Sequence, residues 1–243
     1  DPAQNACNYA NSLGVNTIND FFGIDTAEAI KNEYGTFDHI SANNVYAHND
    51  DLQSFTKAIS NILESGGVFS FEISYLIDIV NKSLVGTIFH EHLSHHSLLP
   101  LFHFLEIYDL HLFDAIKVDT QGGALICFAS KTIKREKTIS LKSLVEIEES
   151  LNVTSHAYMN SFRQNIISLK SNFTRNLNNF KSKEYRFIGY GAARSANFLI
   201  EFLQLGNIID IVIDDNYEKI GKFLPNSSIR IENAQEFIFE DGD

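Results

Sequence analysis

The densest group of reactive side chains in this 243-residue chain is a run of histidines. Four of the nine histidines lie within seven residues, in the segment Phe89-His90-Glu91-His92-Leu93-Ser94-His95-His96. A carboxylate beside an imidazole can orient the ring and raise its basicity. The segment therefore suits a general base that works near neutral pH.

Two other interpretations of this run stay open from the residues alone. His92 and His96 have the spacing that places two imidazoles on one helix face, as in a metal site. The segment lacks the His-Glu-x-x-His pattern of zinc proteases, and no Cys or Asp follows at ligand spacing, so we expect no metal. A histidine-rich surface loop without chemistry is the remaining interpretation.

A second segment with chemical potential is Gly189-x-Gly191-x-x-Arg194, which follows an apolar stretch. Asp214 ends the next apolar stretch, so the spacing is typical of a dinucleotide fingerprint whose third glycine is missing. We expect Arg194 in the first turn of a helix, where it could pair with a phosphate. The alternatives are a tight strand-to-helix turn without a ligand and true NAD binding.

Several polar residues follow predicted strands. His48 and Asn43 come after the strand expected over residues 37–42, and Asp20 and Phe21 come after one expected over 15–18. Ligands of open α/β sheets bind at the carboxyl ends of the strands, so we expect His48 and His92 to converge on one cleft. Considered alone, His48 could be a solvent-exposed histidine, Asn43 a helix cap and Phe21 a core residue.

Alternating apolar patterns predict the elements that position these residues. Helices are expected over 3–13, 26–34, 50–64 and 98–109, and strands over 15–18, 37–42, 68–73, 110–118 and 124–130. In the helix over 50–64, Asn49 or Asp50 caps the start and Gly66-Gly67 stops it. The alternation predicts a mostly parallel sheet covered on both faces, and the last two strands predict an antiparallel hairpin at its edge.

A second αβ unit is expected after a charged boundary at residues 131–138. Residues 140–182 have the pattern of one or two long helices, and a strand over 185–191, a helix over 192–205 and a strand over 208–213 follow. The predicted domain limits are therefore 1–131, 132–183 for a helical linker, and 184–243.

Composition excludes several partners. Nineteen Lys and Arg against 31 Asp and Glu give a net charge of −12, which repels the phosphate backbone of nucleic acids. The sequence shows no apolar run of about 18 residues and no secretory signal, so we expect a cytoplasmic protein without a membrane partner. Cys7 and Cys127 lie far apart and suit buried free thiols better than a disulfide.

Several segments together resemble one family. They are Ala42–Leu52, Gly66–Leu76, Thr87–Ser94, Gln121–Leu125 and Gly189–Asn197. Their residues and order are similar to the S-adenosylmethionine-dependent C-methyltransferases of nucleotide-activated keto sugars. The resemblance implies an α/β fold: a class I methyltransferase (Rossmann-like) domain without its first strand, then a truncated Rossmann-like domain that helps hold the sugar nucleotide. The family's N-terminal zinc-binding domain is not expected in this chain.

The resemblance also implies catalytic roles. His92 would remove a proton beside the keto group of a nucleotide-linked deoxysugar, with dTDP as the expected nucleotide, and the resulting enolate carbon would take the methyl group. Glu91 would orient or polarise the histidines, and His48 would stabilise the enolate oxygen. Such a reaction needs a base and an oxyanion donor, and these residue types supply both.

Binding residues follow from the same resemblance. Cofactor contacts fall on Asp1, Asp20, Phe21 and Asn43, with Asp1 on the ribose and Asp20 and Phe21 at the adenine. Substrate contacts fall on Tyr75, His90, Gly191 and Arg194, with Arg194 on the diphosphate. As a terminal residue, Asp1 could instead be mobile.

Two departures from the family pattern keep other functions open. Phe89 stands where the family has a tyrosine, and His95-His96 stand where aromatic residues are usual. A non-catalytic module that holds a nucleotide sugar or a partner protein is the main alternative. An NAD-dependent oxidoreductase that uses the Gly189 turn is a second alternative.

Overall fold

The computed structural model describes residues 1–181 and 185–239, and the chain divides into two units. The first unit comprises Asp1–Ile77 and Leu93–Thr154, and the second comprises Asp78–His92 and Ser155–Asp243. The segment Asp78–His92, which contains Phe89, therefore belongs to the second unit, although the residues on both sides of this segment belong to the first.

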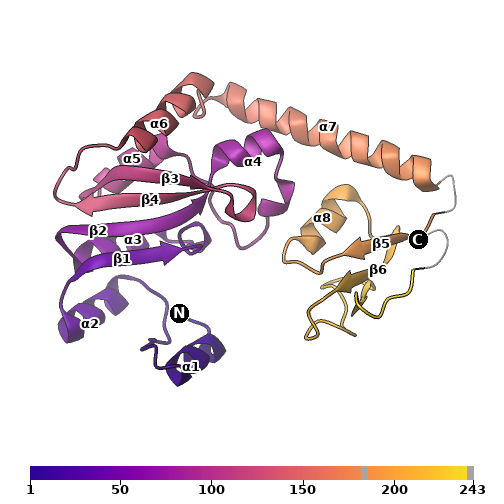
Figure 1. Cartoon of the computed structure of the whole chain (residues 1–243), viewed down its shortest axis with the longest axis horizontal. Helices are drawn as coiled ribbons and strands as arrows, with labels where there is room; N and C mark the ends of the chain where they lie inside the picture. Colours follow the sequence, from indigo (N-terminus) through magenta and orange to yellow (C-terminus); the bar gives the residue numbers. More distant parts are fainter. Residues whose placement is uncertain (182–184, 240–243) are drawn as a thin grey trace. The chain divides into compact units, whose positions relative to one another are not determined.

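The first unit contains a four-stranded sheet in the order β1-β2-β4-β3 (Figure 1). Its strands are β1 (Phe37–Asn43), β2 (Leu63–Ser74), β3 (Leu110–Val118) and β4 (Ala124–Lys131). β1 and β2 pair in parallel, and β4 runs antiparallel to both β2 and β3, so three strands share one direction. The predicted α/β class and the terminal hairpin are confirmed.

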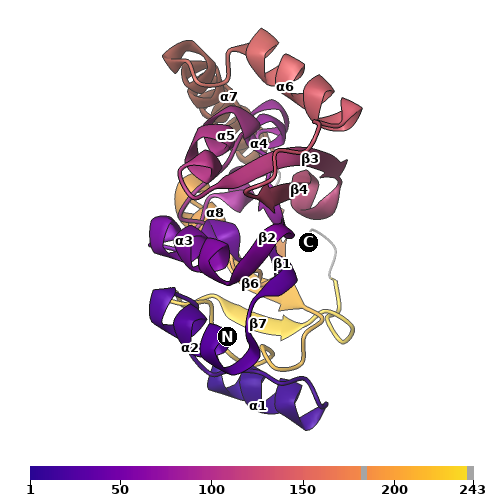
Figure 2. The same ribbon diagram turned by 90° about the vertical axis from the view of Figure 1, so that its left-hand side faces the viewer.

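The first unit also contains helices. They are α1 (Gln4–Ser12), α2 (Ile24–Tyr34), α3 (Leu52–Ile62), α5 (Leu98–Glu106) and α6 (Ile139–Leu151), while α4 (Leu76–Lys82) spans the border of the two units. Figure 2 shows α3 and α5 on the same side of the sheet. α3 buries Phe55, Ala58, Ile59 and Ile62, a stripe with the helical period that the sequence predicted.

Three local predictions in this unit are wrong. Residues 15–18 form no strand, since the Thr17 amide and the Ile18 carbonyl bond to Asn11 and the N-terminus rather than to a neighbouring strand. Asp51, not Asn49 or Asp50, caps α3 by accepting a hydrogen bond from the Ser54 amide at 3.0 Å. α3 passes directly into β2 at Leu63, so Gly66 and Gly67 lie within a strand.

The second unit contains a three-stranded parallel sheet in the order β5-β6-β7. Its elements are the long helix α7 (His156–Lys181), β5 (Phe187–Tyr190), α8 (Ala196–Leu203), β6 (Ile209–Asp214) and β7 (Arg230–Asn233). Val212, Leu224, Ile229 and Ile231 form its core with Ile200 of α8 packed against them. β7 is a four-residue strand that the sequence did not predict.

α8 begins later than predicted. The chain from Gly191 to Ser195 forms a turn, in which the Ala196 amide bonds to the Ala193 carbonyl, and the helix starts only at Ala196. Arg194 therefore precedes the helix, and its expected place in the first helical turn is corrected.

The predicted domain limits at 131 and 183 stay predictions. α6 belongs to the first unit and α7 to the second, while residues 182–184 and 240–243, where the predicted linker and second domain end, lie outside the described residues. Within the described part of the chain, no helix is long and apolar enough to cross a membrane. Cys7 and Cys127 are buried free thiols, as expected.

Candidate active site

A tight turn in the second unit holds the predicted base. The His92 amide donates to the Phe89 carbonyl at 3.0 Å, which closes the turn over residues 89–92. The His92 ring lies with Nδ1 2.7 Å from the carbonyl oxygen of Thr87. A carbonyl oxygen only accepts, so Nδ1 carries the proton and Nε2 carries the lone pair of the neutral ring. This tautomer makes Nε2 the nitrogen that can accept a proton.

The same turn distinguishes the two histidines that spacing alone could not separate. The Phe89 ring lies against His92, with the ring centroids 4.4 Å apart, and His92 is half-buried. His90 is exposed, and its Nε2 lies 3.9 Å from Glu91 Oε1. His92 thus has the fixed orientation that a base needs, while His90 faces solvent.

The second sequence motif lies beside this turn. Arg194 Nη1 donates to Glu91 Oε2 at 2.6 Å, although 103 positions separate the two residues. A Cβ added at Gly86 would lie 3.7 Å from Ser195 Oγ, so the segment just before the histidine block packs on the turn that precedes α8. The fold therefore joins two motifs within one unit.

The two glycines of the second motif serve different needs. A Cβ at Gly189 would lie 2.8 Å from Val212 Cγ2, so only glycine allows β5 to pack this closely on β6. Gly191 has φ +93°, a conformation that favours glycine, and no atom lies within 4 Å of where its Cβ would be. Gly191 thus leaves open space at the carboxyl end of β5.

Asp214 closes this turn from the end of β6. One carboxylate oxygen accepts from the Ala192 amide at 2.7 Å and from Lys219 at 3.2 Å, and the other accepts from the Asn216 amide at 2.8 Å. These bonds, that of Asn216 first, hold the pKa of Asp214 below its usual range. Asp214 thus holds the turn at the carboxyl ends of β5 and β6.

An exposed aromatic ring stands at the same edge. Tyr190 ends β5 with 72 % of its surface exposed, and its hydroxyl donates to Asp215 Oδ2 at 2.6 Å. This bond is the main cause that raises the pKa of Tyr190. The sequence analysis did not single out Tyr190 or Asp215, although both stand at strand ends.

His48 and Asn43 lie in the first unit at the carboxyl end of β1. Asn43 is its last residue and exposed, and half-buried His48 ends a short 3₁₀ turn over Tyr46–His48. Within this unit, the Leu93 amide donates to the Ala47 carbonyl at 2.9 Å. The residue after His92 is thus hydrogen-bonded to the residue before His48.

Three of the predicted cofactor residues come from neighbouring loops of the first unit. The Asn19 side chain donates to the carbonyls of Asp1 and Pro2, which holds the loop of Asp20 and Phe21 beside Asp1. Phe21 is 76 % exposed, which excludes the core role considered for it. Asp20 accepts from the Phe21 amide at 2.7 Å, and Asp1 accepts from the Ala3 amide at 2.8 Å.

Tyr75 occupies the interior of the first unit instead of its surface. It is 1 % exposed and is one of the largest fully buried side chains of this unit. This burial indicates a packing role, and the substrate contact expected for Tyr75 stays a prediction.

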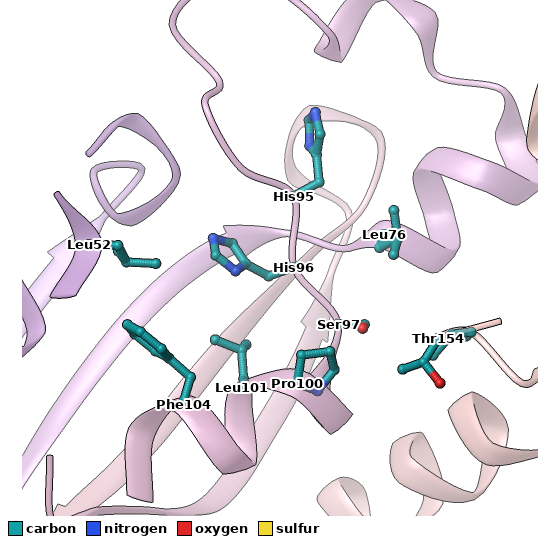
Figure 3. A pocket seen from close by; sticks show the side chains of 10 residues that line it. Leu52, Leu76, His95, His96, Ser97, Pro100, Leu101, Phe104 and Thr154 are labelled. Atoms are coloured by element: carbon teal, nitrogen blue, oxygen red, sulfur yellow. The ribbon is translucent and has the colours of Figure 1, made fainter. Parts of the chain in front are cut away.

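A cavity of about 320 Å³ lies in the first unit at the end of β2. Figure 3 shows the His96 ring directed toward Leu52, while His95 points away from it. The lining is mostly apolar: Leu52, Leu76, His95, His96, Ser97, Pro100, Leu101, Phe104, Val153 and Thr154. The predicted site residues, all of which the structure describes, do not line this cavity. In residues 1–181 and 185–239, no group of three or more His, Cys, Asp or Glu side chains is placed to hold a metal ion.

Comparison with known proteins identifies the family. Residues 119–243 match the model of the C-methyltransferase C-terminal domain, which is just over half of the chain. The chain belongs to this C-methyltransferase family. A curated relative, the C-methyltransferase NovU of Streptomyces niveus, is 27 % identical over 233 residues. The alignment covers 95 % of this chain and 56 % of NovU, so the chain spans little more than half the length of that relative. The family expected from the sequence is confirmed.

Solved structures align less closely. Magnesium protoporphyrin IX methyltransferase from Synechocystis PCC 6803, with bound SAH, matches at TM-score 0.32 and 12 % identity, over 40 % of this chain and 45 % of that chain. The 1,6-didemethyltoxoflavin-N1-methyltransferase of Burkholderia thailandensis matches at TM-score 0.35 and 14 % identity, over 54 % and 57 %. Alignments of this quality do not establish a shared ligand or activity.

Proposed function

We propose that this chain is part of an S-adenosylmethionine-dependent C-methyltransferase that acts on a nucleotide-linked keto-deoxysugar. Family membership supports methyl transfer to carbon. The main support for the proposal is that the turn with His92 and the turn with Arg194 lie side by side in one unit, linked by the hydrogen bond from Arg194 to Glu91. A base with a fixed tautomer and a cation suited to a diphosphate are the two groups that such a substrate needs.

His92 is the proposed base. With Nδ1–H held by Thr87, Nε2 can take the proton from the carbon next to the keto group. The ring does not have to change tautomer or orientation before it reacts, which lowers the cost of reaching the transition state. His48 is the proposed donor to the enolate oxygen, a role that the family resemblance implies for it.

Residues of the first unit fit the cofactor chemically. Asp1 offers an exposed carboxylate for the ribose hydroxyls, and Asn43 offers an amide. Asp20 and the exposed ring of Phe21 are the proposed contacts of the adenine. When bound, S-adenosylmethionine supplies the electrophilic methyl group that the enolate carbon takes up.

Substrate binding is assigned to the carboxyl edge of the β5–β6–β7 sheet. Arg194 is 71 % exposed and can turn its guanidinium to a diphosphate, and Gly191 leaves room for a close approach to the backbone. His90 is exposed on the adjacent turn and is the remaining proposed substrate contact.

One observation favours a second candidate, a non-catalytic module that binds nucleotide sugars. Phe89 packs on His92 but has no hydroxyl with which to hold a proton or the substrate, unlike the tyrosine that the resemblance leads one to expect. In this case the protein binds the nucleotide sugar but transfers no methyl group.

The test is methyl transfer by the full-length protein with labelled S-adenosylmethionine and a dTDP-linked 4-keto-deoxysugar. We expect His92→Asn to slow transfer at least about 100-fold, the scale of a lost general base, and to leave cofactor affinity within about twofold. His90→Asn should have a smaller effect on the rate, and exposed His156→Asn none.

Two results would contradict this proposal. A His92→Asn protein that retains most of the rate, or that loses cofactor binding instead, removes His92 as the base. Binding of dTDP by wild-type protein without any methyl transfer supports the non-catalytic module.

A further inference from the structure

The cation assigned to the diphosphate already holds an anion in this structure. Arg194 Nη1 lies 2.6 Å from Glu91 Oε2, within the distance of a charge-assisted hydrogen bond. A carboxylate and a phosphate present the same pair of acceptor oxygens to a guanidinium. Glu91 therefore occupies the position that a substrate phosphate would need.

Exposure makes this ion pair easy to separate. The Arg194 side chain is 71 % exposed and that of Glu91 is 33 % exposed. Solvent screens such pairs strongly, so they contribute little to stability. A diphosphate carries more negative charge than a carboxylate and can bind the arginine in a bidentate manner. We therefore expect it to displace Glu91 from Arg194.

We propose that Glu91 is a resident anion that the substrate diphosphate displaces from Arg194. This inference rests on the proposed function, since it requires a nucleotide diphosphate as ligand. Glu91 pairs with Arg194 before the substrate binds and leaves it afterwards. The exchange favours a ligand that carries a diphosphate, because the charge of the diphosphate replaces that of Glu91 on Arg194.

The displaced carboxylate stays within the histidine block. Glu91 Oε1 is 3.9 Å from His90 Nε2 already in the paired state. Once Arg194 is taken, the full negative charge of Glu91 acts on the block that also contains His92. The sequence predicted that Glu91 polarises the histidines, whereas in this structure Glu91 pairs with Arg194. The exchange allows both roles, one before and one after the substrate binds.

The experiment is calorimetric titration of dTDP into the full-length protein. Glu91→Gln removes the competing charge, so we expect dTDP to bind about two- to fivefold more tightly, the scale of an exposed ion pair. Arg194→Ala should weaken binding about tenfold or more. In the Arg194→Ala background, Glu91→Gln should change the affinity less than twofold, because the two residues act as a unit.

Glu201→Gln is the matched control, since it removes the same charge from an exposed position on α8. The exchange is wrong if Glu91→Gln tightens dTDP binding no more than Glu201→Gln does, or if it weakens dTDP binding. In either case the role of Glu91 is only to hold Arg194 in place. Absence of dTDP binding by the wild-type protein contradicts the proposed function itself. Wild-type binding without the Glu91 effect contradicts the exchange alone.

Discussion

Single hydrogen bonds decide what the titratable groups of this protein can do. The Thr87 carbonyl sets the tautomer of His92, and two backbone amides and Lys219 engage the Asp214 carboxylate. His92 can therefore accept a proton at Nε2, whereas the Asp214 carboxylate stabilises a turn. Neither outcome depends on the residue type alone.

His96 offers a test at this scale. Burial is the main cause that lowers the pKa of His96 to about 4 from an ordinary value of 6.5, and the neighbouring His95 is the second cause. Below about pH 6.5 this histidine is protonated in the unfolded chain. In the folded state it stays neutral until the pH falls to about 4. The stability from the neutral ring is therefore complete above pH 6.5 and is lost as the pH falls toward 4.

We expect this residue to account for about 2 kcal/mol of the stability that the protein loses between pH 7 and pH 5. Urea unfolding of the wild-type protein and of His96→Gln at both pH values measures it. The variant should lose less stability on acidification than the wild type, and exposed His103→Gln should match the wild type. Equal losses in wild type and His96→Gln would show that the ring is not held neutral.

The start of α5 shows how an element depends on a distant residue. The Leu98 and Leu99 amides donate to the two carboxylate oxygens of Glu148 at 2.6 and 2.9 Å, and Pro100 has no amide hydrogen to place. The Leu101 amide makes the first bond within the helix, to the Ser97 carbonyl. All amides of the first turn are thus satisfied, and proline fits there without cost.

Replacing Glu148 by Ala should therefore lower the free energy of unfolding by about 2–4 kcal/mol, because the buried Leu98 amide and the partly buried Leu99 amide lose their acceptor. Thermal or urea denaturation followed by circular dichroism measures the effect. Glu149→Ala, on the exposed side of the same helix, is the control, and an equal effect of both variants would refute the cap.

At the scale of the whole molecule, α6 is part of the first unit, although it lies beyond the predicted domain limit at residue 131. At the start of α6, Thr138 and Ser140 hydrogen-bond to β3. Near the end of α6, Glu148 accepts a hydrogen bond from the first residue of α5. A fragment that ends at 131 loses all of these contacts and exposes the surfaces of α5 and β3 on which α6 packs.

Two fragments with a common start, one ending at residue 131 and the other at residue 154, test this point. We expect the longer fragment to melt several degrees higher, since it retains the Glu148 cap and the α6 contacts. Differential scanning fluorimetry compares the two. A shorter fragment of equal stability would instead support the domain limit that the sequence predicted.

Local patterns in the sequence determined much of this protein. Periodic apolar residues located α2, α3, α5, the β3–β4 hairpin and the second αβ unit, because burial of one face imposes the helical or strand period. Motif order indicated the family, which the match over residues 119–243 confirms. Composition gave the acidic charge that argues against a nucleic-acid partner.

Tertiary structure decided the rest. Residues 15–18 are apolar enough for a strand, but a strand also needs a neighbour with which to pair its amides and carbonyls, and none is used there. The same holds for the site: Thr87 chooses the tautomer of His92, and Glu91 meets Arg194 across 103 positions. Such partners are set by how the folded elements pack, and no local period in the sequence records them.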